Sequence, residues 1–187
     1  MLAYVFWHWR RFGVPSGDYE ARLVNFHRAM KEAPPAGFTW SSCVAVSNES
    51  WANDGKDAYE DWYCIDNVNA LDALNDAAIS AARQQPHDAA AAVVQDGTAG
   101  LYRLKFGQPQ VAPLYAHWFG KPDGWPYQKL FDTIEPLTRG NSRALWKRQM
   151  SLGPALEFCL HAREQLTLPP GIASQAIKLR SVFPERV

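Results

Sequence analysis

The sequence predicts an α+β protein in which one βαββαβ unit occurs twice and the two units pack sheet against sheet. Two observations support this fold class. The strand-like aromatic segments 4–11 and 114–120 are copies of each other, and the His-Trp pairs that begin at His8 and His117 coincide in them. Each copy is followed by a Gly/Pro/Asp-rich turn and by a helical pattern that opens with a tyrosine.

In the first unit, aromatic and β-branched runs predict strands, and apolar residues three and four positions apart predict helices. Asp18 is expected to cap the first helix. A long polar loop, 48–58, separates the second and third strands, and the sequence assigns it no role. The expected order is strand 2–11, helix 19–31, strand 38–47, strand 59–66, a helix after Asn69, a short helix within 84–97 and strand 99–106.

The second unit repeats this order in shortened form. A tight turn at Gly153-Pro154 replaces the long loop, and the segment 165–171 carries two prolines and is too short for a full helix. The expected elements are strand 114–119, helix 127–137 with Asp123 as its cap, strand 144–152, strand 155–162 and strand 176–183. We therefore expect two ferredoxin-like repeats, 1–110 and 111–187, the second with a degenerate last helix, in one compact molecule.

Side chains alternate between the two faces of a strand, so each repeat can be divided into two sets. The apolar set is expected beneath the helices, and the set that mixes aromatic and charged residues is expected to face a cavity between the two sheets. The apolar set is Val5, Trp7, Trp9, Tyr63, Ile65, Tyr102, Leu104, Phe106, Leu114, Ala116, Trp118, Phe158, Leu160, Ile177 and Leu179. The mixed set is Phe6, His8, Arg10, Glu60, Trp62, Cys64, Asp66, Arg103, Lys105, Tyr115, His117, Phe119, Glu157, Cys159, His161, Lys178 and Arg180.

The composition excludes several classes of function. Lys and Arg (19) balance Asp and Glu (19), and no basic stripe supports binding to nucleic acid or to a membrane surface. No apolar run approaches a membrane span, and no P-loop, GxGxxG or HExxH motif is present. The start of the chain lacks a signal-peptide pattern, and the three cysteines form no CxxC pair, so we expect reduced thiols in the cytoplasm.

His8 and His117 are the candidate catalytic residues, because a histidine in an enclosed aromatic cavity can act as a general base near neutral pH. The alternative is that both hydrogen-bond to acids such as Glu60 or Glu157 and hold the sheets in register. Arginines and lysines of the mixed set would bind an anionic ligand or pair with acids across the cavity. The candidate ligand-binding residues are Arg10, Glu60, Trp62, Arg103, Tyr115, Glu157, His161 and Arg180.

A metal site is not predicted, although the mixed set contains His, Cys and Glu side chains, because their spacing matches no metal motif. No cofactor is predicted either. His27 lies beside the apolar stripe of the first helix and is expected at or near the surface.

The element order and the internal repeat resemble the dimeric α/β-barrel superfamily, which includes antibiotic-biosynthesis monooxygenases, EthD-like proteins and their fused two-copy relatives. The resemblance covers nearly the whole chain. It implies a cofactor-free oxidation of an electron-rich aromatic compound, or a related rearrangement of a small molecule. His8, Arg10 and Trp62 would then bind and deprotonate the substrate.

Two hypotheses of function follow. The protein binds or transforms a small aromatic or acidic metabolite between the two sheets, or it is a non-catalytic interaction module whose inner face is an ion-paired network. A homodimer is also expected, because the missing helix leaves apolar strand residues without a cover unless the segment 89–94 reaches them. A net charge near zero favours association as well. The residues in need of a cover are Phe158, Leu160, Ile177 and Leu179.

Overall fold

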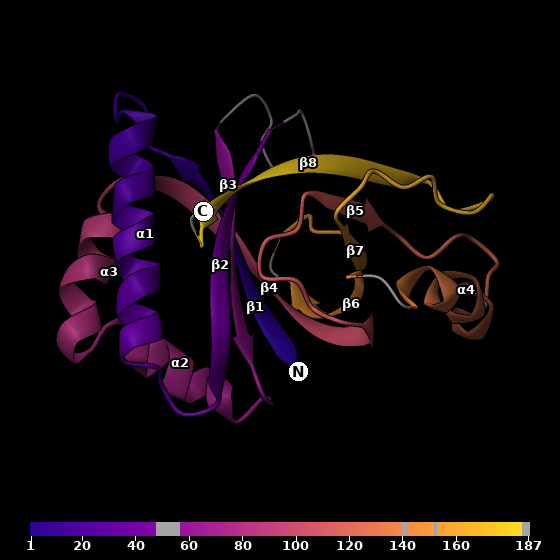
Figure 1. Ribbon diagram of the computed structural model, residues 1–187, viewed down its shortest axis with the longest axis horizontal. Coiled ribbons are helices and arrows are strands. Elements are labelled where there is room, and N and C mark those ends of the chain that lie inside the picture. Colours follow the sequence, from indigo (N-terminus) through magenta and orange to yellow (C-terminus); the bar gives the residue numbers. More distant parts are fainter. Residues whose placement is uncertain (48–56, 140–141, 152, 185–187) are drawn as a thin grey trace.

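The computed structural model describes residues 1–47, 57–139, 142–151 and 153–184 (Figure 1). The loop 48–58, to which the sequence assigns no role, therefore lies mostly outside the described residues. The first half contains β1 (Leu2–Arg10), α1 (Ser16–Glu32), β2 (Phe38–Val46), β3 (Ala58–Ile65), α2 (Ala70–Ala78), α3 (Gln84–Ala91) and β4 (Val94–Gly107). The second half contains β5 (Tyr115–Phe119), α4 (Tyr127–Ile134), β6 (Ala144–Ser151), β7 (Phe158–Ala162) and β8 (Ser174–Phe183).

The eight strands form one closed antiparallel barrel in the order β1-β3-β2-β8-β5-β7-β6-β4. Within each half the order is fourth, first, third and second strand, which is the arrangement of a ferredoxin-like sheet. The pairs β2–β8 and β4–β6 join the two sheets edge to edge and close the barrel. Closure leaves no free sheet edge, and it confirms the predicted tandem α+β fold class.

A cluster of large apolar side chains fills the barrel. It draws on all eight strands and on no helix, which places it in the interior. Its aromatic members are fully or almost fully buried, and their rings contact one another at centroid distances of 5.4 to 6.3 Å. These aromatic residues are Trp7, Trp62, Tyr102, Trp118 and Trp146.

On the outside of the first half, α1, α2 and α3 cover the sheet (Figure 1). Tyr19, Leu23, Phe26 and Met30 of α1 form the predicted apolar stripe, and all four are buried against the strands. The helix begins at Ser16, three residues earlier than predicted. Asp18 therefore lies in the first turn of the helix, where its negative charge interacts favourably with the positive end of the helix dipole.

On the outside of the second half, α4 and the segment 163–173 cover the sheet. They bury Phe158 and Leu160 together with Leu130, Ile134, Leu168 and Ile172. Ile177 and Leu179 point into the barrel instead. The expectation that the segment 89–94 or a second copy would cover these four strand residues was therefore wrong, because the chain covers two of them itself and encloses the other two. A homodimer stays a prediction without that support.

β4 begins at Val94, five residues before its predicted start, and includes Gly97 and Gly100. Both glycines lie where neighbouring rings pack on the backbone. A Cβ atom at Gly97 would meet the Phe6 ring and, at 2.9 Å, the carbonyl oxygen of Trp7, and one at Gly100 would lie 2.9 Å from the Tyr102 ring. These glycines therefore permit close packing and do not end the strand. No helix in the described part of the chain is long and apolar enough to cross a membrane.

Candidate functional site

Strand register decides which side chains enter the barrel. β1 pairs with β3 so that Trp7 lies opposite Glu60 and His8 lies opposite Tyr59. Residues opposite each other in an antiparallel pair share a face. Val5 and Trp7 therefore share the interior with Glu60 and Trp62, whereas His8 shares the outer face with Tyr59.

The predicted faces were right for β3 and β7 and wrong for β1, β4, β5 and β8. Alternation within a strand does not fix its phase relative to its neighbours, because a shift of one residue exchanges the two faces. The charged residues on the four strands lie outside, where they avoid the cost of burying an unpaired charge. The large apolar residues that were expected beneath the helices fill the barrel instead.

Seven of the ten candidate residues therefore lie outside the barrel, contrary to the predicted placement. Arg10 pairs with Asp57, and Arg180 pairs with Glu20 of α1. Glu157 accepts a hydrogen bond from Tyr127 of α4 at 2.7 Å, and Arg103 contacts Gln149. Tyr115 stacks beside His117, with 6.4 Å between ring centroids. The seven are His8, Arg10, Arg103, Tyr115, His117, Glu157 and Arg180.

Glu60, Trp62 and His161 are the three candidates that the barrel interior brings together. The Trp62 indole donates to Glu60 at 3.1 Å, and the His161 ring lies edge-on to Trp62 at 4.4 Å between centroids. Burial raises the pKa of Glu60 to about 7, although the indole N–H groups of Trp62, Trp7 and Trp118 partly offset this rise. Burial also lowers the pKa of His161 to about 3, so its ring is neutral. This interior is packed with aromatic side chains, and among the described residues it shows no ion pair.

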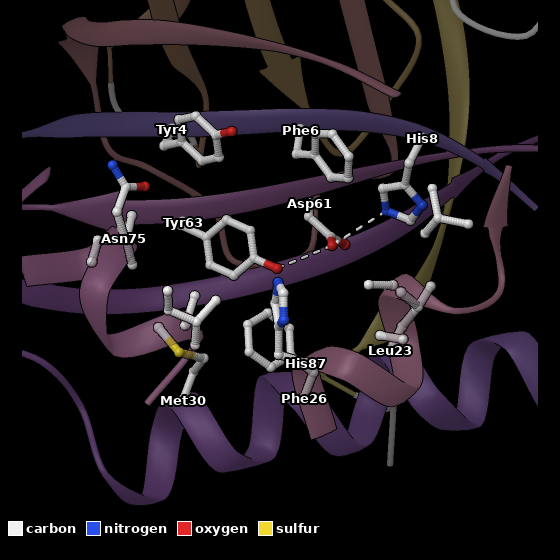
Figure 2. Close-up of a pocket in the computed structure, with 16 residues that line it drawn as sticks. Tyr4, Phe6, His8, Leu23, Phe26, Met30, Asp61, Tyr63, Asn75 and His87 are labelled. Carbon is white, nitrogen blue, oxygen red and sulfur yellow. Dashed lines mark hydrogen bonds and ion pairs between the residues drawn. The ribbon is translucent and has the colours of Figure 1, made fainter. Parts of the chain in front are cut away.

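The cavity that has the features of a ligand site lies elsewhere, between the outer face of β1 and β3 and the helices α1, α2 and α3 (Figure 2). Its volume of about 320 Å³ is at the small end of the range for small-molecule sites, roughly 300–1,000 Å³. Most of its lining is aromatic or aliphatic. Its aromatic and aliphatic lining includes Tyr4, Phe6, Leu23, Phe26, Met30 and Leu74.

The polar end of this pocket is built on Asp61, which lies on the face of β3 opposite to that of Glu60. Two histidines and one tyrosine converge on its carboxylate, and Figure 2 shows two of these three partners, His8 and Tyr63. His8 Nε2 lies 3.2 Å from Oδ2, His27 Nε2 lies 3.1 Å from Oδ1, and the Tyr63 hydroxyl donates to Oδ2 at 3.1 Å. Burial alone would raise the pKa of Asp61, but the two histidines outweigh it and hold that pKa well below its usual range.

The other ring nitrogen of each histidine faces a hydroxyl group. His8 Nδ1 lies 2.5 Å from the Tyr19 hydroxyl, and His27 Nδ1 lies 2.8 Å from Ser41 Oγ. The two ion pairs with His8 and His27 and the hydrogen bond from Tyr63 together offset the cost of burying the carboxylate charge.

His117, the counterpart of His8, occupies a different environment. Its Nε2 accepts a hydrogen bond from the backbone N–H of Leu166 at 3.2 Å, and burial lowers its pKa. Its side chain lines none of the described cavities. The sequence repeat therefore preserves the position of the histidine but not its surroundings.

Asp61, Tyr63 and His27 were not among the predicted site residues, and His27 is buried where a surface position was expected. Two signals in the sequence could have found them. Glu60 and Asp61 are adjacent in a predicted strand, so they must occupy opposite faces, and Tyr63 must share the face of Asp61. His27 lies four residues after Leu23 and three before Met30, which places it on the buried stripe of α1.

His27, Asp61 and Cys43 also form a cluster of potential metal ligands. Each is buried, and one ligand atom from each lies within 4.8 Å of the others. Of the ten predicted site residues, only His8 contacts this cluster directly, through Asp61. The sequence missed the cluster because its three members come from α1, β2 and β3, at no motif-like spacing.

No family model and no curated protein matches this sequence. Solved structures do match, and two of those that cover 97% of the chain have TM-scores above 0.5. One is an anthrone oxidase-like protein with 10% identity, a TM-score of 0.52 and 93% of its own chain covered. The other is a candidate monooxygenase from Lactobacillus acidophilus with 8% identity, a TM-score of 0.58 and 94% covered.

The fold is that of the dimeric α/β-barrel proteins. At these identities the likeness establishes the fold and leaves the activity open. Here one polypeptide supplies both halves of the barrel.

Proposed function

We propose that this protein binds a small hydroxylated aromatic compound in the pocket beneath α1, α2 and α3, and oxidises it with dioxygen as the oxidant. The observation that carries the proposal is the pocket itself, a mostly apolar cavity of about 320 Å³ with His8 and Asp61 toward one end and Asn75 at the other. This location differs from the predicted one, since the pocket lies outside the barrel and not between the two sheets.

The lining favours an aromatic ligand. Phe6, Phe26 and Tyr63 present rings to the cavity, and aromatic pairs gain about 0.5–1.5 kcal/mol beyond the burial of their area. Met30 adds a polarisable side chain that adapts to the outline of a ring.

The polar end favours a neutral hydroxyl group over an acid. The Tyr63 hydroxyl donates a hydrogen bond to Asp61, and the oxygen of this hydroxyl can still accept a hydrogen bond from a ligand. A ligand carboxylate would lie near the ionised Asp61 and lose its own hydration, which is unfavourable for like charges in a buried site. Of the aromatic and acidic metabolites that the sequence allowed, the geometry therefore supports the aromatic ones.

The oxidation is supported by the fold shared with an anthrone oxidase-like protein and a candidate monooxygenase. Asp61 and Tyr63 would hold the hydroxyl of the substrate, His8 would position Asp61, and the apolar lining would exclude water from the ring. The non-catalytic alternative is favoured by a different observation: Asp61 already forms two ion pairs and one hydrogen bond within the protein, as a purely structural network would.

Calorimetric titration with 1-naphthol and with 2-naphthoate tests the binding proposal. We expect 1-naphthol to bind and 2-naphthoate to bind at least about tenfold more weakly, because a charge difference of this kind is worth roughly 1.4 kcal/mol or more. Ala78→Trp, which fills the pocket from α2, should abolish 1-naphthol binding. Ala73→Trp, on α2 but outside the pocket lining, should preserve it. Equal binding by both tryptophan variants would contradict this location.

An oxygen electrode tests the oxidation. In the presence of anthrone, whose enol tautomer carries the required hydroxyl group, the unaltered protein and Ala73→Trp should consume dioxygen faster than anthrone in buffer does, and Ala78→Trp should not. Binding of 1-naphthol without any consumption of dioxygen would support the non-catalytic alternative for this pocket.

A further inference from the structure

Three consecutive elements of the first half each supply one potential ligand atom to a buried point beside the pocket. Cys43 of β2 and Asp61 of β3 are directly opposite each other in the sheet, and α1 places His27 over them. All three side chains are buried, and their ligand atoms lie within 4.8 Å of one another.

The surrounding hydrogen bonds orient these atoms toward a common point. His27 Nε2 lies 3.1 Å from Asp61 Oδ1, while its Nδ1 is held by Ser41 Oγ at 2.8 Å. A histidine that binds a metal through one nitrogen is usually held through the other in this way. On the far side of the carboxylate, His8 and Tyr63 occupy Asp61 Oδ2, which leaves Oδ1 to face His27 and Cys43.

The charges of these three side chains also favour a bound cation. The carboxylate of Asp61 is buried within 4.8 Å of a thiol that would also be negative once ionised. A divalent cation bound to one thiolate, one carboxylate and one neutral imidazole gives a complex of zero net charge. The cation would therefore remove the cost of a buried negative charge instead of adding a charge of its own.

We propose that His27 Nε2, Cys43 Sγ and Asp61 Oδ1 bind one divalent transition-metal ion, of the zinc or cobalt type. A thiolate and an imidazole favour these ions over magnesium and calcium, which prefer oxygen ligands. The proposal does not depend on what occupies the neighbouring pocket.

Binding of the metal ion requires a small change in the distances between the three ligand atoms. Bonds of about 2.0–2.3 Å in a tetrahedral site put ligand atoms roughly 3.3–3.8 Å apart. The widest separation in the cluster therefore shortens by about 1 Å on binding, and three protein ligands leave the fourth position for water or another small group. The Cys43 thiol proton is released to solvent, and the single proton of the His27 ring moves to Nδ1, where it is donated to Ser41.

Titration of metal-free protein with Co²⁺ tests the site. We expect one equivalent to give a near-ultraviolet thiolate-to-cobalt charge-transfer band together with the visible bands of tetrahedral cobalt. Cys43→Ser should remove the charge-transfer band. Cys64→Ser is the matched control, because Cys64 is a buried cysteine of β3 on the interior face of the barrel. It should leave the band unchanged.

Ser41→Ala keeps all three ligands but frees the His27 ring, and it should weaken Co²⁺ binding about tenfold. Circular dichroism checks that each variant is folded. A folded unaltered protein that shows no charge-transfer band would overturn the proposal and leave a hydrogen-bonded core cluster, and so would a band that survives in Cys43→Ser. Ala78→Trp should retain the cobalt band, which separates failure of this site from failure of the pocket.

Discussion

Glu60 and Asp61 are adjacent acids with opposite surroundings. Asp61 faces the helices, where its ion pairs with His8 and His27 outweigh the effect of burial and keep its pKa low. Glu60 faces the barrel interior, where burial dominates and raises its pKa to about 7. One step along a strand therefore separates a carboxylate that is ionised at any physiological pH from one that is half protonated near neutrality.

This contrast predicts how Glu60 affects stability. In the unfolded chain Glu60 ionises near the ordinary glutamate pKa of 4.5, whereas in the folded protein it retains its proton up to a pH of about 7. Between these values the folded state binds more protons, so its stability falls as the pH rises. The loss for this residue amounts to about 3 kcal/mol above pH 7.

Glu60→Gln removes the ionisable group and keeps an acceptor for the indole N–H groups. We expect urea denaturation to show that this variant gains up to about 3 kcal/mol relative to the unaltered protein between pH 4.5 and pH 8. Glu32→Gln, an exposed site on α1, provides the control for loss of a carboxylate. If the difference in stability between Glu60→Gln and the unaltered protein did not change with pH, that result would show that Glu60 is not desolvated.

At the scale of elements, the pairing of β1 with β3 and β4 determines what the pocket contains. The same register that places Trp7 opposite Glu60 also places Phe6 opposite Asp61. It therefore brings one aromatic and one acidic side chain to the outer face beneath α1. On the other side of β1, Gly97 of β4 lies opposite His8, and the Phe6 ring packs against it.

Gly97→Ala tests this packing. The added Cβ would meet the Phe6 ring and lie 2.9 Å from the Trp7 carbonyl oxygen, so we expect a loss of about 1–3 kcal/mol in the free energy of unfolding. Gly120→Ala, where nothing lies within 4 Å of the new atom, should change stability by less than about 0.5 kcal/mol. Equal stability of the two variants in urea would mean that Phe6 does not pack on Gly97.

At the scale of the whole molecule, both halves contribute side chains to the barrel interior. Trp7 and Trp62 come from the first half, Trp118 and Trp146 come from the second, and the four form one cluster. Neither half buries these side chains alone, so the sheet of each half depends on the other for its cover.

A fragment of residues 1–110 should therefore not persist as a folded monomer. Light scattering after size-exclusion chromatography should show a dimer or larger species, because the exposed interior face would associate. Co-expression with residues 111–187 should restore a one-to-one complex. A monomeric fragment with a cooperative thermal transition would contradict this interdependence.

The fold was predictable because the repeat and the apolar periodicities are local signals. Residues close together in the sequence are enough to predict each of three features. These are the two copies around His8 and His117, the apolar helix stripe from Tyr19 to Met30, and the shortened second half. The barrel itself was predictable in outline, because two sheets that each have helices on one face must cover each other's bare faces.

The site was only partly predictable. The sequence placed Glu60, Trp62 and His161 together on the interior face, as the structure does. It missed the network on Asp61, because that network joins residues of α1, β1, β2 and β3 that are close only after the strands pair.

The sequence by itself determined the order of strands and helices, the duplication and the supply of aromatic side chains for a core. Only the tertiary structure decided which face of each strand points inward, and hence that the pocket lies under the helices while the barrel is filled. The physical reason is that alternation has a period of two residues and no intrinsic phase: the phase is set by hydrogen-bond register between strands, which is a non-local property.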